Sequence, residues 1–160
     1  MGGYPECHTP ATYKETLKRL RKSMQGRRYE DIEPCCALIF YPWEPSSRAY
    51  ERILKAAKDY LAMYPDIQWA AGGGKGHPGL RTHQIIHDDT LLEELSSQVP
   101  DWLAEATLIY GGMEECMDRM LKFFEAGCRH LILEPYWIER NKVMDAIREA
   151  GRIANAVRAY

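Results

Sequence analysis

The sequence predicts an α/β domain built on a parallel sheet. Short apolar runs, too short to form helices, recur at 35–41, 107–110 and 130–133. Longer segments between these runs carry apolar residues at helical spacing. Strands joined through helices run parallel, because the crossover returns the chain to the same end of the sheet. The 160 residues, of which 46% are hydrophobic, are enough for a single domain that spans 1–160.

Capping residues and prolines predict the first elements. Thr9 offers a hydroxyl N-cap and Pro10 occupies the first helical position, so we expect a helix to begin there. The run 35–41 lies between two prolines and is apolar throughout, which is typical of a buried strand in a parallel sheet. Ser46 or Ser47 then caps a second helix that has one apolar side.

The alternation resumes after a glycine-rich interruption. Residues 71–79 contain too many glycines and breakers for a regular element. Asp88, Asp89 and Thr90 then provide a cap for the next helix. The elements expected from there are, in order, a short helix over 91–99, a strand over 107–110, a helix over about 114–126 that ends at Gly127, a strand over 130–133 and a final helix from about 140.

Composition and charge limit the kinds of partner. The 21 Lys and Arg residues against 23 Asp and Glu residues give a net charge of −2, so the basic footprint of a nucleic-acid-binding domain is missing. No apolar run approaches the ~18 residues that a membrane span needs. Cys35 and Cys36 are adjacent inside an apolar run, as buried reduced thiols are. We therefore expect no nucleic-acid or membrane partner and a reducing, cytoplasmic compartment.

Two motif-like clusters are interpreted without assigned chemistry. The stretch 72–75 is similar to part of a phosphate loop, but Gly76 follows the lysine where that loop needs Ser or Thr. His83 and His87 have the spacing of two zinc ligands on one helix face, but a third ligand is not identifiable. We predict no metal site and interpret these residues as loop, polar or capping residues.

Aromatic and acidic residues follow two of the predicted strands. Tyr41 ends the run 35–41 and Trp43 follows it, and Glu134, Tyr136 and Trp137 come after 130–133. Because ligands of parallel α/β sheets bind at the carboxyl ends of the strands, these side chains are candidates to line a substrate pocket. The alternative is that they cap the hydrophobic core.

A set of matches over 111–133 carries a family resemblance. The segment reads GGMEEC at 111–116, continues as an amphipathic stretch and ends as EAGCRHLIL at 125–133. It resembles the C-terminal signature of luciferase-like monooxygenases, in which a Gly-Thr-Pro-Glu-Glu-type turn precedes a helix, Ala-Gly and the last barrel strand. Gly112 and Met113 stand where Gly-Thr-Pro is common. Further matches lie at 4–13 and 31–34, which resemble the exit of the sixth barrel strand, the sixth helix and the entry to the seventh strand. Those at 62–65, 76–78, 87–89 and 95–101 resemble the long insertion before the last helix-strand unit.

The resemblance is closest to the branch that uses the deazaflavin coenzyme F420, such as methylenetetrahydromethanopterin reductase-like proteins. It implies a partial (β/α)8 TIM-type barrel, of which this chain supplies the last three strands with their helices. It also implies an oxidoreductase that transfers a hydride between F420, or alternatively FMN, and a small organic substrate. Ring contacts in the family come largely from earlier strands, so no catalytic or cofactor-binding residue is assigned.

The resemblance also implies a rim that binds substrate. In relatives that use sugar phosphates, the loop after the sixth strand and the segment after the eighth help to bind the phosphate. The corresponding positions are His8, Thr9, Arg140 and Lys142. Thr9 offers a hydroxyl and helix amides, and the two cations offer charge. The alternative roles are an N-cap and a solvated helix start.

An incomplete barrel leaves sheet edges that must be covered. The expected partners are a small-molecule substrate and either a second copy of the chain or a missing N-terminal barrel chain. The chain is then a fragment or truncated product of an oxidoreductase, or one part of a split enzyme. The alternatives are a non-catalytic remnant that self-associates or binds a partner, and an unrelated small α/β domain.

Overall fold

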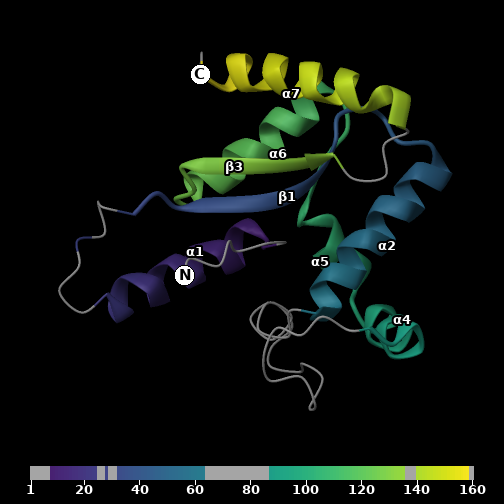
Figure 1. The fold of residues 1–160 in the computed structure, drawn as a ribbon. Helices are drawn as coiled ribbons and strands as arrows, with labels where there is room; N and C mark the ends of the chain where they lie inside the picture. The colour runs from purple at the N-terminus through teal and green to yellow at the C-terminus, as the bar shows by residue number, and fades with distance from the viewer. Residues whose placement is uncertain (1–7, 25–27, 29–31, 64–86, 136–139, 159–160) are drawn as a thin grey trace.

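The structure is a computed structural model that describes residues 8–24, 28, 32–63, 87–135 and 140–158. Its sheet contains the strands β1 (Cys35–Tyr41), β2 (Leu108–Tyr110) and β3 (His130–Pro135) in the order β2-β1-β3. Both strand pairs are parallel, and β1 lies in the middle. Figure 1 shows β1 and β3 side by side. The predicted α/β class and parallel sheet are therefore confirmed.

Helices precede and connect the strands. In order they are α1 (Pro10–Ser23), α2 (Ser47–Met63), α4 (Asp89–Ser97), α5 (Asp101–Glu105), α6 (Met113–Glu125) and α7 (Val143–Arg158), with the short 3-10 helix η2 (Arg140–Lys142) before α7. Sequence analysis missed α5, which is only 5 residues long and follows Pro100 without a side-chain cap. Asp88 caps α4 as predicted, because its carboxylate accepts hydrogen bonds from the amides of Thr90 and Leu91 at 3.0 and 3.1 Å.

The strand order bears on the predicted barrel. The resemblance makes 35–41 and 130–133 consecutive barrel strands, and β1 and β3 are indeed neighbours, with Cys35 through Phe40 aligned to His130 through Pro135. The third strand, β2, pairs with the other edge of β1, opposite Ile39, Phe40 and Tyr41 only. The residues expected to end the preceding barrel strand lie outside the described part of the chain. The described residues form an open three-stranded sheet, so the partial barrel stays a prediction.

Two hydrophobic clusters cover the two faces of β1. One face presents Cys36, Leu38 and Phe40 to α1, α6 and α7, with Tyr13, Phe123 and Ile153 among the buried partners. The other face presents Ile39 to α2 and α5, where Leu61 and Leu103 are buried. The middle strand is thus buried on both sides, as its continuous apolar sequence predicts.

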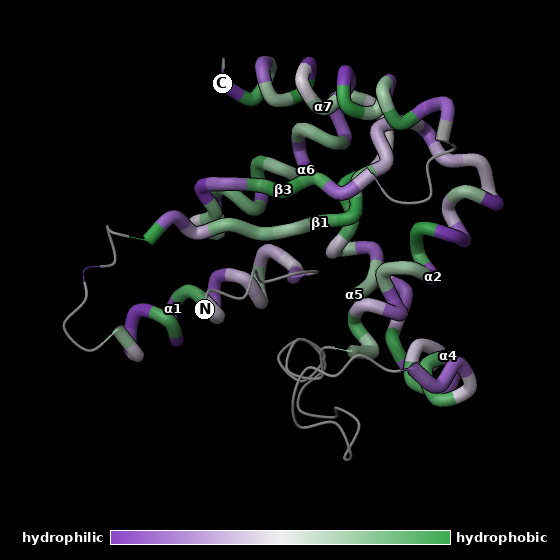
Figure 2. Tube along the Cα trace, viewed as in Figure 1, coloured by the Kyte–Doolittle hydropathy of each residue, from purple (hydrophilic) through white to green (hydrophobic). Residues whose placement is uncertain are grey.

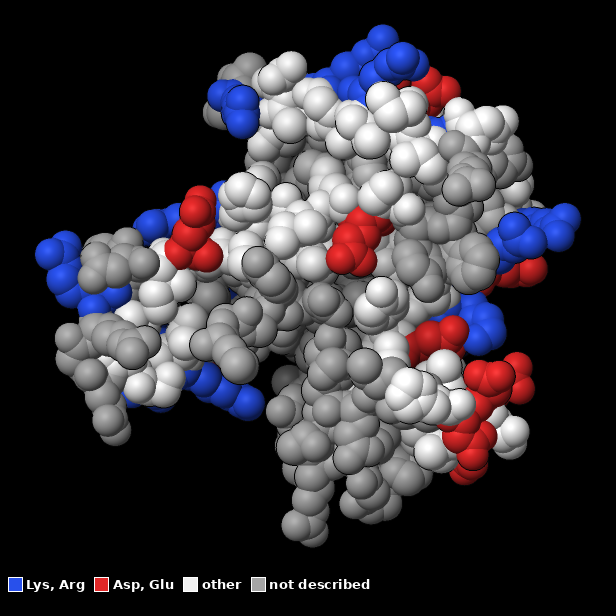
Figure 3. Space-filling view, viewed as in Figure 1, with Lys and Arg blue, Asp and Glu red and all other residues white. Residues whose placement is uncertain are grey.

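The surface of the described part is mixed in charge and polarity. Figure 2 shows hydrophobic and hydrophilic stretches alternating along the helices. In the view of Figure 3, acidic side chains gather over α4, whereas basic side chains gather over α1 and α7. No helix among the described residues is both long enough and apolar enough to cross a membrane.

Candidate functional site

A groove of about 540 Å³, called here the edge groove, lies between the carboxyl end of β1 and the start of α7. Its volume falls in the range of small-molecule sites, roughly 300–1,000 Å³. Tyr41, Trp43 and Lys142, which were predicted as site residues, all line it. The remaining lining residues carry charge: Glu44, Asp145, Arg148, Glu149 and Arg152.

The sheet topology explains why the groove forms there. The chain leaves β1 toward β2 and then returns past β1 to reach β3 on the other side. In open α/β sheets such a reversal leaves a crevice outside the carboxyl ends of the two strands that flank it. Residues after β1 form one wall, and the helices that follow β3 form the other. The groove therefore occupies the position at which this class of fold binds ligands.

Two aromatic rings form the wall that follows β1. The rings of Tyr41 and Trp43 meet edge to face, with centroids 5.5 Å apart and planes at 85°. A tight turn fixes them, since the Trp43 amide donates to the Tyr41 carbonyl at 2.9 Å. The amide of Gly111 donates to the same carbonyl at 3.3 Å and ties this turn to the end of β2. Both rings are half-buried, so each offers a face to a ligand.

The α7 wall is zwitterionic. Arg148 donates to Asp145 at 2.7 Å, and Arg152 donates to Glu149 at 2.8 Å. Each pair is spaced i,i+3 along α7, and of the four side chains only Glu149 is half-buried. Such pairs contribute little to stability, at most about 1 kcal/mol each, and a ligand can compete for either partner. The groove thus offers flat apolar surface on one side and exchangeable charges on the other.

A second polar cluster lies at the end of β2 and was not found by sequence analysis. Tyr110, the strand neighbour of Tyr41, donates its hydroxyl hydrogen bond to the Glu105 carboxylate. The Arg119 guanidinium stacks 4.0 Å from the centroid of the Tyr110 ring. Burial and the bond to Glu105 raise the pKa of Tyr110 to about 12. This phenol therefore stays protonated at neutral pH and acts as a donor.

Arg119 also contacts backbone carbonyls in this cluster. Its Nη1 donates to the carbonyls of Glu105 and Leu108 at 3.4 and 3.5 Å. Tyr50 packs its ring 5.8 Å from that of Tyr110. The residues that contact Tyr110 are Tyr50 of α2, Glu105 of α5 and Arg119 of α6. Only the tertiary structure brings them together, and no motif in the sequence signals the cluster.

His8 and Thr9 lie at the start of α1 and do not line the groove. Thr9 is the N-cap, and its hydroxyl accepts from the Thr12 amide at 3.1 Å. The His8 ring is 7% exposed, and its Nδ1 lies 3.2 Å from the Thr12 hydroxyl. Burial lowers the pKa of His8 to about 4, so the ring is neutral at neutral pH. The structure thus gives Thr9 the capping role that was the alternative, and a ligand role for both residues stays a prediction.

The remaining predicted residues are placed only in part. Glu134 lies opposite Ile39 in the strand ladder and is half-buried, but it is not among the residues that line the groove. Arg140 begins η2, and its side chain lies outside the described part, as do Tyr136 and Trp137. A pocket role for these four residues stays a prediction.

Buried thiols were predicted from the adjacent cysteines. Cys36, Cys116 and Cys128 are buried thiols outside any disulfide, and Cys35 is a half-buried one. Burial raises the pKa of the Cys116 thiol to about 12, so it is not a nucleophile at neutral pH. The glycine-rich stretch 72–75 and His83 lie outside the described residues. Within the described part, no cluster of three or more His, Cys, Asp or Glu residues could hold a metal ion.

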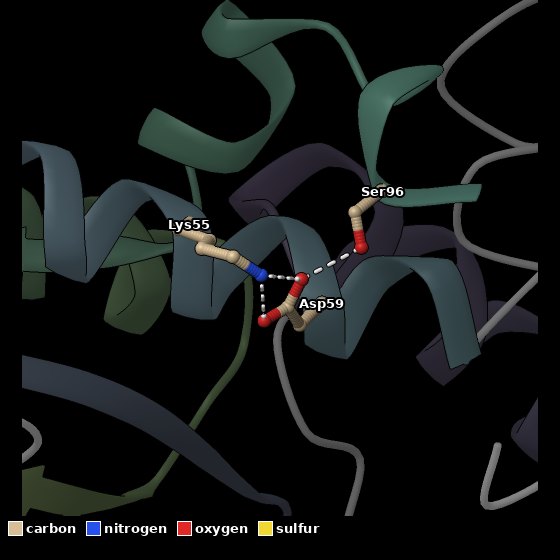
Figure 4. Close-up of polar contacts among 3 residues, drawn as sticks. All are labelled: Lys55, Asp59 and Ser96. Carbon is tan, nitrogen blue, oxygen red and sulfur yellow. Dashed lines mark hydrogen bonds and ion pairs between the residues drawn. The ribbon is translucent and has the colours of Figure 1, made fainter. Parts of the chain in front are cut away.

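A serine, an aspartate and a lysine meet between α2 and α4 (Figure 4). Ser96 donates to Asp59 at 2.7 Å, and Lys55 donates to both oxygens of the same carboxylate at 3.0 and 2.9 Å. The lysine neutralises the carboxylate instead of activating the serine. The cluster contains no histidine, and the hydrogen bond from Ser96 to Asp59 links α4 to α2.

The fold and the edge groove define an α/β protein with a ligand-sized site at the carboxyl ends of its strands. In its fold the chain is similar to an F420-dependent secondary alcohol dehydrogenase, solved in complex with an F420-acetone adduct. The TM-score is 0.61 and the sequence identity is 16%. The match covers 90% of this chain and 40% of the dehydrogenase chain, so this chain spans less than half of that protein's length. No family model and no curated protein sequence matches the chain.

Proposed function

We propose that this chain is the C-terminal part of an F420-dependent oxidoreductase of the luciferase-like family, in which the edge groove binds a coenzyme or substrate ring. The observation that carries the proposal is the coincidence of two features. The fold is similar to that of a dehydrogenase that depends on F420. The groove lies at the carboxyl end of β1, with an aromatic wall of Tyr41 and Trp43.

The residues of the groove fit a planar and partly anionic ligand. Tyr41 and Trp43 supply half-buried ring surface, which binds flat heterocycles by stacking. Lys142, Arg148 and Arg152 line the same groove and can meet a carboxylate or phosphate. When F420 is bound, its deazaflavin ring supplies the hydride chemistry. The part of this chain is to orient one ring face and to exclude water from it.

In this proposal, the strands that complete the barrel come from a second chain or from further sequence. The described sheet has three strands, whereas a closed barrel of this type has eight. The chain also spans only 40% of the dehydrogenase chain. The substrate we propose is a small organic molecule, with FMN as the alternative coenzyme.

A non-catalytic remnant that associates with itself is the second candidate. The observation that favours it is the exposure of large apolar side chains on α7, where Met144 and Ile147 are 59% and 53% exposed. Such exposure is typical of a surface that meets another protein.

The test is a fluorescence titration with F420 and, separately, FMN, on the wild type, Trp43→Ala and Trp102→Ala. Trp102 is a matched control, since it is 57% exposed on α5 and does not line the groove. Stacking on an aromatic side chain contributes about 1–3 kcal/mol. We therefore expect Trp43→Ala to weaken binding at least fivefold and Trp102→Ala to leave it unchanged. Equal effects of both substitutions would contradict the assignment of the groove.

A further inference from the structure

Helix α7 carries an apolar stripe that faces solvent. Met144 and Ile147 are 59% and 53% exposed, and Gly151 and Ala154 are also exposed. These four residues, the α7 stripe, are spaced three, four and three residues apart. That is the spacing of the seam along which two helices pack in a coiled coil. The buried residues of the helix, Ala146 and Ile153, lie on a different side.

The α7 stripe is separate from the proposed coenzyme groove. The groove is lined by Asp145, Arg148, Glu149 and Arg152, which occupy other positions around the helix. At its C-terminal end the stripe joins an apolar groove of about 610 Å³, because Ala154 lines that groove together with Leu131 and Leu133 of β3. The apolar surface thus continues from the helix to the outer strand of the sheet.

We propose that two copies of this chain associate through the α7 stripe, with the two helices antiparallel about a two-fold axis near Glu149. In that arrangement Met144 of one copy faces Ala154 of the other, and Ile147 faces Gly151. The two helices then meet in four layers, and in each layer a large side chain faces a small residue. A closed two-fold contact of this kind is isologous, so one surface serves both copies.

The space needed for this packing is present. A Cβ atom placed on Gly151 would meet no heavy atom within 4 Å, so the surface above this glycine is open to a side chain from another helix. A parallel pair would put Ile147 on Ile147 and Gly151 on Gly151, which leaves a void at the glycine layer. The order of large and small residues therefore selects an antiparallel second copy as the occupant.

The association needs no coenzyme and is tested without one. Sedimentation equilibrium is run on the wild type, on Ile147→Gly, on Gly151→Ile and on the double variant that exchanges the two residues. Each single variant disturbs two symmetry-related layers, and we expect the dissociation constant to rise tenfold or more. The exchange places large against small again, so we expect the double variant to recover most of the affinity.

Trp102→Ser is the control for general loss of exposed apolar surface, since Trp102 is 57% exposed on α5 and far from α7 in the sequence. Circular dichroism checks that each variant keeps the helix content of the wild type. A wild-type chain that is monomeric at 200 μM would overturn the proposal. So would a dimer that the single variants do not weaken, a double variant that is no better than the single ones, or a different protein chain found to cover the stripe. None of these results depends on coenzyme binding.

Discussion

The buried histidine at the start of α1 makes stability depend on pH in a way that can be calculated. His8 is 7% exposed, and its ring meets the Tyr13 ring edge-on, with centroids 5.9 Å apart. Burial lowers its pKa from 6.5 to about 4. The unfolded chain thus binds a proton near pH 6.5, whereas the folded chain resists it until about pH 4. Stability is therefore full above pH 6.5 and is lost as the pH falls toward 4.

The size of the effect follows from the shift in pKa. Each pKa unit corresponds to about 1.36 kcal/mol, so the full contribution of His8 is about 3 kcal/mol. Between pH 7.5 and pH 5, about 2 kcal/mol of this is lost. That is a large fraction of the roughly 5–15 kcal/mol by which folded domains are stable.

The assay is urea unfolding of the wild type and of His8→Gln at pH 7.5 and pH 5. Glutamine keeps a polar group near Thr12 but does not titrate, so the variant loses the contribution of His8 to the pH dependence. We expect the free energy of unfolding of the wild type to fall by about 2 kcal/mol more than that of the variant. An equal fall in the free energy of unfolding of both proteins would contradict this role of His8. So would an NMR titration of His8 in the folded chain with a midpoint near 6.5.

Three further outcomes are expected. Gly111→Ala should destabilise the chain by about 1–2 kcal/mol or more, since its φ is +108° and a Cβ there would lie 2.9 Å from Glu115 Cβ; thermal unfolding measures the loss. Ser96→Ala should cost about 1 kcal/mol, and Asp59→Ala should cost more because it removes the shared acceptor of Ser96 and Lys55; faster amide exchange confined to α4 would locate the effect. Glu105→Gln should lower the pKa of Tyr110 from about 12, but only in part, because burial is the larger cause of the raised pKa and remains when the carboxylate is gone; ultraviolet titration of the phenol measures this, and an unchanged midpoint would contradict the cluster.

The elements of the fold were predictable because local chemistry determines them. Thr9 and Asp88 were expected as caps, and both cap helices in the structure. The prolines around β1 and the apolar run between them predicted a strand that is buried on both faces. The strand β2, which follows α5, was also expected from its short apolar run. The helix α5 itself was missed, since five residues are too few to show helical periodicity.

The site was predictable only where it depends on the ends of strands. Tyr41 ends β1 and Trp43 lies two residues beyond it, so the rule that ligands bind at carboxyl ends was enough to select them. The cluster of Tyr110, Glu105 and Arg119 depends on how three elements pack, which the sequence does not reveal. The strand order was not predictable for the same reason, because tertiary contacts, and not the strand sequences alone, determine which strands pair.

Binding of F420 to the purified wild-type chain is the most direct test of the proposed coenzyme site. The measurement is an isothermal titration of the full chain, with circular dichroism to show that it is folded. We predict saturable binding of one F420 per chain, tighter than the binding of FMN and weakened when salt screens Lys142, Arg148 and Arg152. A folded chain that binds neither coenzyme, alone or as a dimer, would contradict the proposal that the groove is a coenzyme site.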